Sequence, residues 1–184
     1  MKILTTKFKD VKLFNPTVYS DDRGFFVESF NQKIQDELNV NFLQDNHSKS
    51  KQYVIRGLHY QWDNPMGKLL RVVSGAGIDV ILDIRKNSPT YGEYESFKLT
   101  DSNFNILWVP PGFAQGFLAL EKNTHLCYKT TALHNGEAEG AIHPLKSGLD
   151  INWGVPSNNI LLSKKDTLAQ NFNQYNHNNF CKLQ

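Results

Sequence analysis

The amino-acid sequence predicts an all-β sandwich or barrel. Short apolar or β-branched runs recur through the middle of the chain, and turn sequences such as residues 22–24 (DRG), 74–77 (SGAG) and 110–112 (PPG) separate them. This close spacing favours antiparallel hairpins over βαβ units. The runs that we expect to form strands are residues 14–18, 53–55, 69–73, 78–84, 97–99, 106–109, 117–120 and 126–130.

Helices are expected only as accessories to the sheets. Ile34 and Leu38 lie four positions apart with charged residues between them, which predicts a helix over residues 32–38, and another short helix is expected near Lys165. Residues 170–180 are rich in Asn and Gln without hydrophobic periodicity, so we expect the tail, about 170–184, to be loosely held. No repeat or linker divides the 184 residues, which predicts one domain over 1–184.

Composition excludes several classes of protein. Twenty Lys and Arg against 18 Asp and Glu, spread without a basic block, argue against a nucleic-acid binder. No apolar run is long enough to span a bilayer, and the first ten residues are too charged for a signal peptide, so we expect a cytoplasmic protein with no membrane partner. Cys127 and Cys181 are the only cysteines and form no C-x-x-C motif, which indicates neither a disulfide framework nor a structural zinc.

Residues 56–61 (RGLHYQ) bring a cation, an imidazole and a phenol to one strand. Strand alternation directs Arg56 and His59 to opposite faces. They can therefore enter one cavity only where a bulge or twist rotates one of them.

Two further acidic residues lie inside an apolar strand run. Alternation directs Asp79 and Asp83 to the same side as Ile81, where an unpaired charge would be costly. A solvated outer face and a polar cavity explain them equally well. Taken alone, Lys68 has the pattern of a surface lysine.

The motifs of common cofactor and nucleophile enzymes are missing. The sequence has no H-x-H pair, and Gln115 stands where a second-strand histidine ligand of a metal-binding double-stranded β-helix would be expected. It also has no G-x-S-x-G elbow and no Rossmann or P-loop glycine pattern. We therefore expect neither a metal nor another cofactor.

Seven segments occur in order between about Phe14 and Asp166, which is nearly the whole chain: residues 22–31 (DRGFFVESFN), 44–50 (QDNHSKS), 56–61 (RGLHYQ), 67–71 (GKLLR), 83–90 (DIRKNSPT), 108–114 (WVPPGFA) and 128–131 (YKTT). Together they resemble the dTDP-4-dehydrorhamnose 3,5-epimerase family. The resemblance implies a cupin-type double-stranded β-helix (a jelly-roll sandwich), a homodimer, and metal-free epimerisation of a nucleotide-linked 4-keto-6-deoxysugar in deoxysugar biosynthesis.

Epimerisation beside a ketone needs a base, a group that stabilises the enolate and an acid on the opposite face. By resemblance, His59 is the base and Asp166 its dyad partner. Lys68 lies near the enolate oxygen, and Tyr128 is the acid. Because C3 and C5 both adjoin the C4 ketone, one base and one acid can serve both carbons if the sugar shifts or flips its ring.

The resemblance also implies the residues that hold the substrate. An arginine fork suits a diphosphate. The matching positions are Arg23, Phe26 and Glu28 on an N-terminal arm that reaches the partner subunit's nucleotide, Gln44, Asn46 and Arg56 at the sugar and diphosphate, and Gln115 where the family commonly has His.

The chain departs from the family at three places. Besides Gln115, Leu133 and His134 occupy positions where two tyrosines often help to build the nucleotide end of the site, and residues 135–144 lack the usual pattern. Our main hypothesis is 3,5-epimerisation of dTDP-4-dehydro-6-deoxy-D-glucose. The departures keep open a single-carbon epimerase acting on a CDP- or GDP-linked 4-keto sugar. A non-catalytic sugar-nucleotide-binding cupin is a third reading, and the presence of all four catalytic candidates argues against it.

Overall fold

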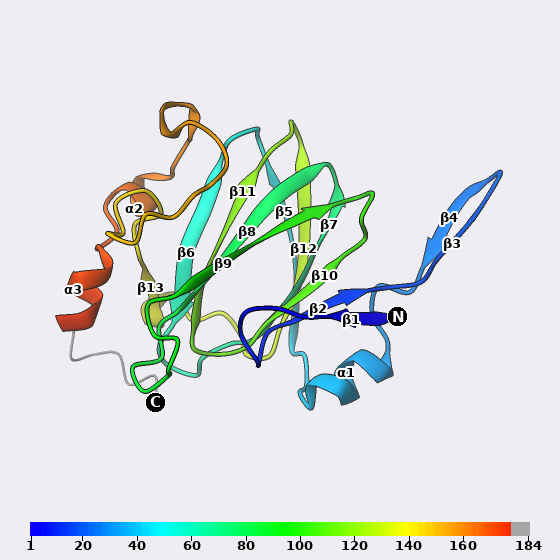
Figure 1. Cartoon of the computed structure of the whole chain (residues 1–184), viewed down its shortest axis with the longest axis horizontal. Helices are drawn as coiled ribbons and strands as arrows, with labels where there is room; N and C mark the ends of the chain where they lie inside the picture. Colours follow the sequence, from blue (N-terminus) through cyan, green and yellow to red (C-terminus); the bar gives the residue numbers. More distant parts are fainter. Residues whose placement is uncertain (178–184) are drawn as a thin grey trace.

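Two antiparallel β-sheets form the body of the protein in the computed structural model, which describes residues 1–177 (Figure 1). The six-stranded sheet has the order β1 (Lys2–Leu4), β2 (Lys12–Asn15), β10 (Ile106–Val109), β7 (Lys68–Ser74), β12 (Thr124–Thr130) and β5 (Gln44–Ser50). The five-stranded sheet has the order β13 (Glu139–Ala141), β6 (Ile55–Gln61), β11 (Phe113–Ala119), β8 (Ala76–Asp83) and β9 (Tyr94–Thr100). The fold is therefore all-β and of the cupin type, as predicted.

Apolar side chains from both sheets meet in one core. Leu70 of β7 and Leu107 of β10 pack in the same cluster as Ile81 of β8 and Phe117 of β11. These four side chains are at most 2% exposed. Removing this apolar surface from water is what holds the two sheets face to face.

The five-stranded sheet is covered on its outer side as well. Val80, Leu82 and Leu118 pack there against Trp153 and other residues of the C-terminal third of the chain. Because both faces are buried, β11 has no solvent-facing residue and β8 has almost none. This explains why residues 78–84 read as a continuous apolar run instead of an alternating pattern.

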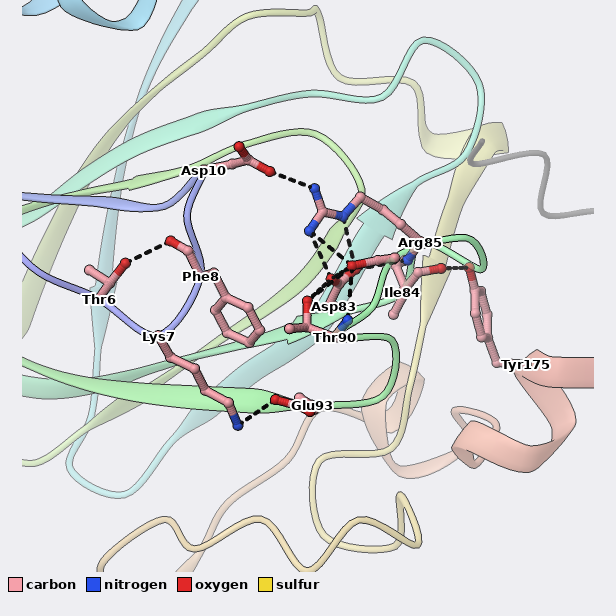
Figure 2. A network of polar contacts seen from close by, with 11 residues as sticks. Thr6, Lys7, Phe8, Asp10, Asp83, Ile84, Arg85, Thr90, Glu93 and Tyr175 are labelled. Atoms are coloured by element: carbon pink, nitrogen blue, oxygen red, sulfur yellow. Dashed lines mark hydrogen bonds and ion pairs between the residues drawn. The ribbon is translucent and has the colours of Figure 1, made fainter.

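The C-terminal segment differs from our expectation of a loose tail. Over the described part of that segment, α3 (Phe172–His177) packs on the outer face of the five-stranded sheet. Phe172 and Tyr175 are buried three positions apart, and the Tyr175 hydroxyl donates a hydrogen bond to the Ile84 carbonyl at 2.8 Å (Figure 2). Two aromatic residues suffice to anchor a short helix, although the polar residues around them hide any periodicity. The rest of the expected tail, residues 178–184, lies outside the described part of the chain.

The other helices lie at the rims of the sheets. The helix α1 (Gln32–Leu38) has the predicted bounds, because the Asn31 side chain caps its N-terminus and Ile34 is fully buried. The predicted helix near Lys165 is α2 (Lys164–Thr167), and two short 3₁₀ turns are η1 (Gly136–Ala138) and η2 (Ser157–Asn159). Within residues 1–177, none of these helices is long and apolar enough to cross a membrane.

A two-stranded hairpin projects from the body. Strands β3 (Val18–Asp21) and β4 (Gly24–Val27) pair only with each other and extend away from both sheets (Figure 1). Tyr19, Phe25 and Phe26 on this hairpin are each more than 60% exposed.

Both aspartates of β8 are fully buried, which excludes the solvated outer face for Asp79 and Asp83. Asp83 accepts hydrogen bonds from Arg85 Nε at 2.9 Å, Arg85 Nη2 at 2.7 Å and Thr90 Oγ1 at 2.7 Å (Figure 2). It accepts a further one from Ser88 Oγ at 2.6 Å. Burial alone would raise the pKa of the Asp83 carboxyl, but these donors outweigh it and hold the pKa below its usual value. The carboxylate thus ties the end of β8 to the turn that follows it.

Replacing Asp83 by Ala should lower the free energy of unfolding by about 3–5 kcal/mol, because it removes one partner of a buried ion pair and the acceptor of the hydrogen bonds from Arg85, Ser88 and Thr90. Urea denaturation followed by circular dichroism measures this change. The Asp83 pKa is lower in the folded state, so its contribution is present above the unfolded pKa of about 4 and is lost as the pH falls through the folded value. The variant should therefore lose less stability than the wild type on acidification. Equal acid sensitivity would contradict the role assigned to this carboxylate.

Candidate active site

A cavity of about 720 Å³ opens between the two sheets. Side chains from both sheets and from the segment before and within α2 line it. Eight of the eleven site residues expected from the sequence are among them: Gln44, Asn46, Arg56, His59, Lys68, Gln115, Tyr128 and Asp166. The other three, Arg23, Phe26 and Glu28, lie on or next to the projecting hairpin, are exposed, and do not line the cavity of their own chain.

A bulge in β6 brings Arg56 and His59 into the same cavity. His59 is opposite Gln115, while Arg56 is opposite Phe117, so three steps along β6 match two along β11. The extra residue in β6 shifts the alternation of side chains by one position, so Arg56 and His59 point to the same face of the strand. At Gly57 the backbone has a φ of +130°, and a Cβ there would lie 2.4 Å from the Gly116 Cα. Only glycine fits this close contact, so Gly57 makes the bulge sterically feasible.

His59 is held by a buried carboxylate. Its Nε2 lies 2.6 Å from Asp166 Oδ1, and Asp166 is 2% exposed. Burial raises the pKa of the Asp166 carboxyl, but the hydrogen bonds from His59 and Ser163 outweigh this and keep the pKa below its usual value. An ionised carboxylate only accepts hydrogen bonds, so Nε2 carries the hydrogen and Nδ1 is the ring nitrogen that can take up a proton.

Ser163 places Asp166 at the start of α2. The Ser163 hydroxyl accepts a hydrogen bond from the Asp166 backbone N–H at 3.1 Å and donates one to the Asp166 carboxylate at 2.8 Å. This is a helix N-cap in which the capping serine also binds the acidic residue three positions later. The cap thus fixes the carboxylate against the imidazole.

Glu139 is a second carboxylate beside His59, and no sequence motif pointed to it. Its Oε1 lies 3.7 Å from His59 Nδ1, and its Oε2 forms an ion pair with Lys165 and lies 3.6 Å from His134 Nε2. Burial raises the pKa of Glu139, but the bond from Lys165 and the nearby imidazoles outweigh it and lower the pKa. Glu139 reaches the site because β13 pairs with β6. No local pattern in residues 135–144 predicts that pairing.

A chain of three polar side chains crosses from one sheet to the other. Lys68 Nζ of β7 donates to Gln115 Oε1 of β11 at 3.0 Å, and Gln115 Nε2 donates to Asp79 Oδ2 of β8 at 2.6 Å. Burial lowers the pKa of Lys68 and raises the pKa of Asp79 to about 8. Lys68 is therefore no ordinary surface lysine, and the amide of Gln115 already has both of its polar atoms bonded within the protein.

Tyr128 approaches the cavity from the sheet opposite His59. It lies on β12 of the six-stranded sheet, whereas His59 lies on β6 of the five-stranded sheet. Burial raises the pKa of the Tyr128 phenol, so the hydroxyl keeps its proton at neutral pH. A ligand between the sheets would thus meet an imidazole on one side and a phenol on the other.

A sequence model of the dTDP-4-dehydrorhamnose 3,5-epimerase family matches residues 5–174. The dTDP-4-dehydrorhamnose 3,5-epimerase of Shigella flexneri is 44% identical over 176 residues, covering 94% of this chain and 96% of that enzyme. The chain belongs to the dTDP-4-dehydrorhamnose 3,5-epimerase family. It is therefore an isomerase that acts on carbohydrates.

Solved structures agree with this assignment. The dTDP-6-deoxy-D-glucose-3,5-epimerase of Legionella pneumophila, in complex with dTDP-4-keto-L-rhamnose, has a TM-score of 0.89 at 39% identity and covers 94% of this chain and 93% of its own. A 3'-monoepimerase from Streptomyces bikiniensis, in complex with dTDP-quinovose, has a TM-score of 0.87 at 26% identity, with coverage of 94% and 88%. The family fold therefore spans almost the whole chain.

In this epimerase, three more polar side chains lie at the wall that is formed by β5 and β6. Gln44 Nε2 donates to Asn46 Oδ1 at 2.8 Å, which orients both amides. Arg56 donates from Nε to Ser50 Oγ at 3.0 Å and from Nη2 to the Lys49 carbonyl at 3.2 Å. Because these acceptors are neutral, the bonds hold the guanidinium in place without neutralising its charge. Among residues 1–177, no three His, Cys, Asp or Glu side chains gather as a metal-binding group.

Replacing Asp166 by Asn keeps an oxygen that can accept the Nε2–H bond but removes the charge that stabilises a protonated ring. The epimerase kcat is expected to fall by about 10- to 100-fold, less than the 10²- to 10⁴-fold that loss of a general base typically costs. Steady-state kinetics of Asp166→Asn beside His59→Ala measures both effects. An Asp166→Asn variant with wild-type kcat would show that the carboxylate does not act on the ring.

Proposed function

We propose that the protein epimerises a nucleotide-diphospho-4-keto-6-deoxyhexose, with dTDP-4-dehydro-6-deoxy-D-glucose as the substrate and C3 and C5 as the inverted carbons. One observation carries the proposal: a base candidate, His59, and an acid candidate, Tyr128, line the same cavity from opposite sheets. Inversion requires a proton to leave one face of the carbon and another to arrive on the opposite face. The names of the similar enzymes support this substrate class.

In the proposed mechanism, Nδ1 of His59 removes the proton from the carbon next to the C4 ketone. The electron pair of the C–H bond forms a double bond between that carbon and C4. The π electrons of the C4 ketone move to its oxygen, which becomes an enolate oxygen. The carboxylates of Asp166 and Glu139, which lie at 2.6 Å and 3.7 Å from the two ring nitrogens, stabilise the imidazolium. The ammonium of Lys68 stabilises the enolate, and a donor of this kind typically accelerates a reaction by 10²- to 10³-fold.

Tyr128 completes the inversion in this proposal. Its hydroxyl donates a proton to the opposite face of the carbon, the enolate collapses to the ketone, and the phenolate then regains a proton from water. His59 loses its extra proton to water, so no net proton or electron is consumed. The cavity volume of about 720 Å³ lies within the range of known small-molecule sites. The Arg56 guanidinium is suited to the diphosphate.

We further propose a homodimer in which the β3–β4 hairpin reaches the partner subunit's cavity, in a cytoplasmic enzyme that needs no metal or other cofactor. Arg23, Phe26 and Glu28 are exposed, and the Arg23 side chain is 90% exposed and, within residues 1–177, has only the neighbouring Asp21 as an ion-pair partner. Exposed aromatic residues in such a group typically mark an interaction surface. An arm that covers a partner's nucleotide accounts for both the charge and the aromatic rings.

A single-carbon epimerase remains the second candidate. Leu133 is 61% exposed and lies next to His134, which lines the cavity, at positions where the family often has tyrosines. This change at the nucleotide end supports a different base, such as CDP or GDP. The similar structure that is described as a 3'-monoepimerase shows that the same fold can serve one carbon.

The substrate and the carbons can be identified by deuterium incorporation. The protein is incubated in deuterated water with 4-keto-6-deoxyhexoses linked to dTDP, CDP or GDP, and NMR locates the deuterium. We expect incorporation at C3 and C5 with the dTDP sugar, and the same result after prolonged chelation. Deuterium at one carbon only, or only with another nucleotide, would select the second candidate. No exchange with any of them would leave a sugar-nucleotide-binding protein.

Tyr128→Phe separates the two faces of the reaction because it removes only the hydroxyl. Removal and return of a proton by His59 on one face needs no second acid, whereas inversion does. The variant should therefore keep exchanging the substrate proton with solvent while inverted product forms more slowly, by about 10²-fold or more. Deuterium exchange and product configuration are measured by NMR in the same sample. If both rates fall by the same factor, Tyr128 does not act as the opposite-face acid.

The exchanged arm predicts complementation between two damaged subunits. Arg23→Ala should weaken binding of the nucleotide, and His59→Ala should abolish chemistry. In a co-expressed heterodimer, the intact core of the Arg23→Ala subunit would receive the intact arm of its partner, so about half of the wild-type sites would be restored. Activity is assayed at substrate concentrations below KM. A mixture with no more activity than the Arg23→Ala homodimer would place the arm at its own subunit's site or at neither.

A further inference from the structure

The chain Asp79–Gln115–Lys68 is built around a carboxyl group that the mechanism above does not use. Asp79 is fully buried on β8, paired across the sheet with Phe97 and Phe117. Its Oδ2 accepts a hydrogen bond from Gln115, whereas its Oδ1 is buried without any partner among residues 1–177. Asp83 on the same strand is equally buried but accepts bonds from three side chains.

This contrast argues against a stabilising role for Asp79. A buried polar atom without a partner costs free energy, and an apolar side chain of similar size at such a position is often neutral or stabilising. Asp83 meets the requirement for a structural buried carboxylate, and Asp79 does not. What Asp79 does possess is a single strong contact with Gln115, which in turn contacts Lys68.

The Gln115 amide can point in two directions that differ little in shape, because its oxygen and nitrogen are similar in size. A carboxyl oxygen at 2.6 Å selects the direction in which Nε2 faces Asp79. The amide oxygen must then face Lys68, whose Nζ lies 3.0 Å away. In the reversed direction, the NH₂ group would face the ammonium and repel it.

We infer that Asp79 is a positioning residue, which acts through Gln115 to hold the Lys68 ammonium at the wall of the cavity where the C4 oxygen of the substrate gains charge. This inference rests on the proposed function for the role of Lys68. The bridge reaches from β8 and β11 in one sheet to β7 in the other, so it also fixes the position of Lys68 relative to His59, which is paired with Gln115.

The bridge does not depend on the charge of Asp79. Burial raises the pKa of Asp79 to about 8, and a neutral carboxyl group still accepts from Nε2 through its carbonyl oxygen. The acidic groups near Lys68 are Asp79 and Glu139, and each favours the ammonium against the opposing effect of burial when it is ionised. An asparagine at position 79 would imitate the neutral acid, whereas a leucine would keep the volume and remove the acceptor.

The test compares Asp79→Leu with Asp79→Asn and uses Asp83→Leu as the matched control on the same strand. Asp79→Leu should lower kcat by about tenfold or more with little change in KM, because it loosens a group that acts on the transition state. Its melting temperature should equal or exceed that of the wild type, whereas Asp83→Leu should melt at a lower temperature. Asp79→Asn should retain most of the wild-type kcat. Unchanged kcat in Asp79→Leu would overturn the inference.

A double-mutant cycle asks whether Asp79 acts through Gln115. Gln115→Leu removes the middle of the bridge and should lower kcat in the same way. Adding Asp79→Leu to it should then cause no further loss, because the two residues act as one unit. Additive losses would mean that Asp79 acts by another route. If Asp79→Leu does not fold, Gln115→Leu alone still tests the bridge, because an unchanged kcat in that variant would refute it.

A chemical readout at Lys68 is independent of the reaction. Brief labelling with acetic anhydride at pH 7, followed by peptide mass spectrometry, measures the fraction of Lys68 that becomes acetylated. This fraction rises when the amine is more accessible or more often deprotonated. Labelling should rise by about threefold or more in Asp79→Leu and stay near the wild-type level in Asp79→Asn, since a lysine is reactive only as the free amine. If the protein epimerises no sugar at all, the proposed function fails but this labelling still decides whether the bridge holds Lys68. Equal labelling in all variants would refute the bridge.

Discussion

The close contact between β6 and β11 at Gly57 is the constraint on which the rest of the site depends. The bulge that this contact contains turns Arg56 and His59 toward one cavity, although simple alternation would separate them. With the imidazole facing inward, Asp166 can bind it from the α2 side and Glu139 from β13. A side chain at position 57 would push β6 away from Gly116 and change the direction of the strand near His59.

The two-sheet architecture places the two groups proposed to transfer protons, His59 and Tyr128, on opposite sides of the cavity. Each sheet sends side chains into the space between them, so a ligand held there would have one sheet on either side. His59 comes from the five-stranded sheet, and Lys68 and Tyr128 come from the six-stranded sheet. The polar groups of the cavity lie next to the apolar core, and the same burial shifts the pKa values of Lys68, Asp79 and Tyr128. Packing and chemistry are therefore not separate parts of this protein.

Residues that come from separate segments limited what could be predicted about the site. Glu139 was not predicted because its place in the site depends on the pairing between β13 and β6. Strand β5 was not predicted because it is polar and has no apolar run. The helix α3 was missed because only two aromatic side chains, Phe172 and Tyr175, anchor it, and they pack on the outer face of the five-stranded sheet. In each case the stabilising partner lies far away in the chain.

By itself, the sequence determined the all-β class, strand β10 and helix α1 with their bounds, because these follow from the local hydrophobic pattern. Its family motifs, which stay intact in the chain, also named eight of the residues that line the cavity. Only the tertiary structure decided that Arg56 and His59 share a face, that Asp79 and Asp83 are both buried but differently partnered, and that Gln115 joins one sheet to the other. The physical reason is that a bulge, a buried hydrogen bond and a desolvated charge each arise from the approach of two strands, and neither strand alone encodes that distance.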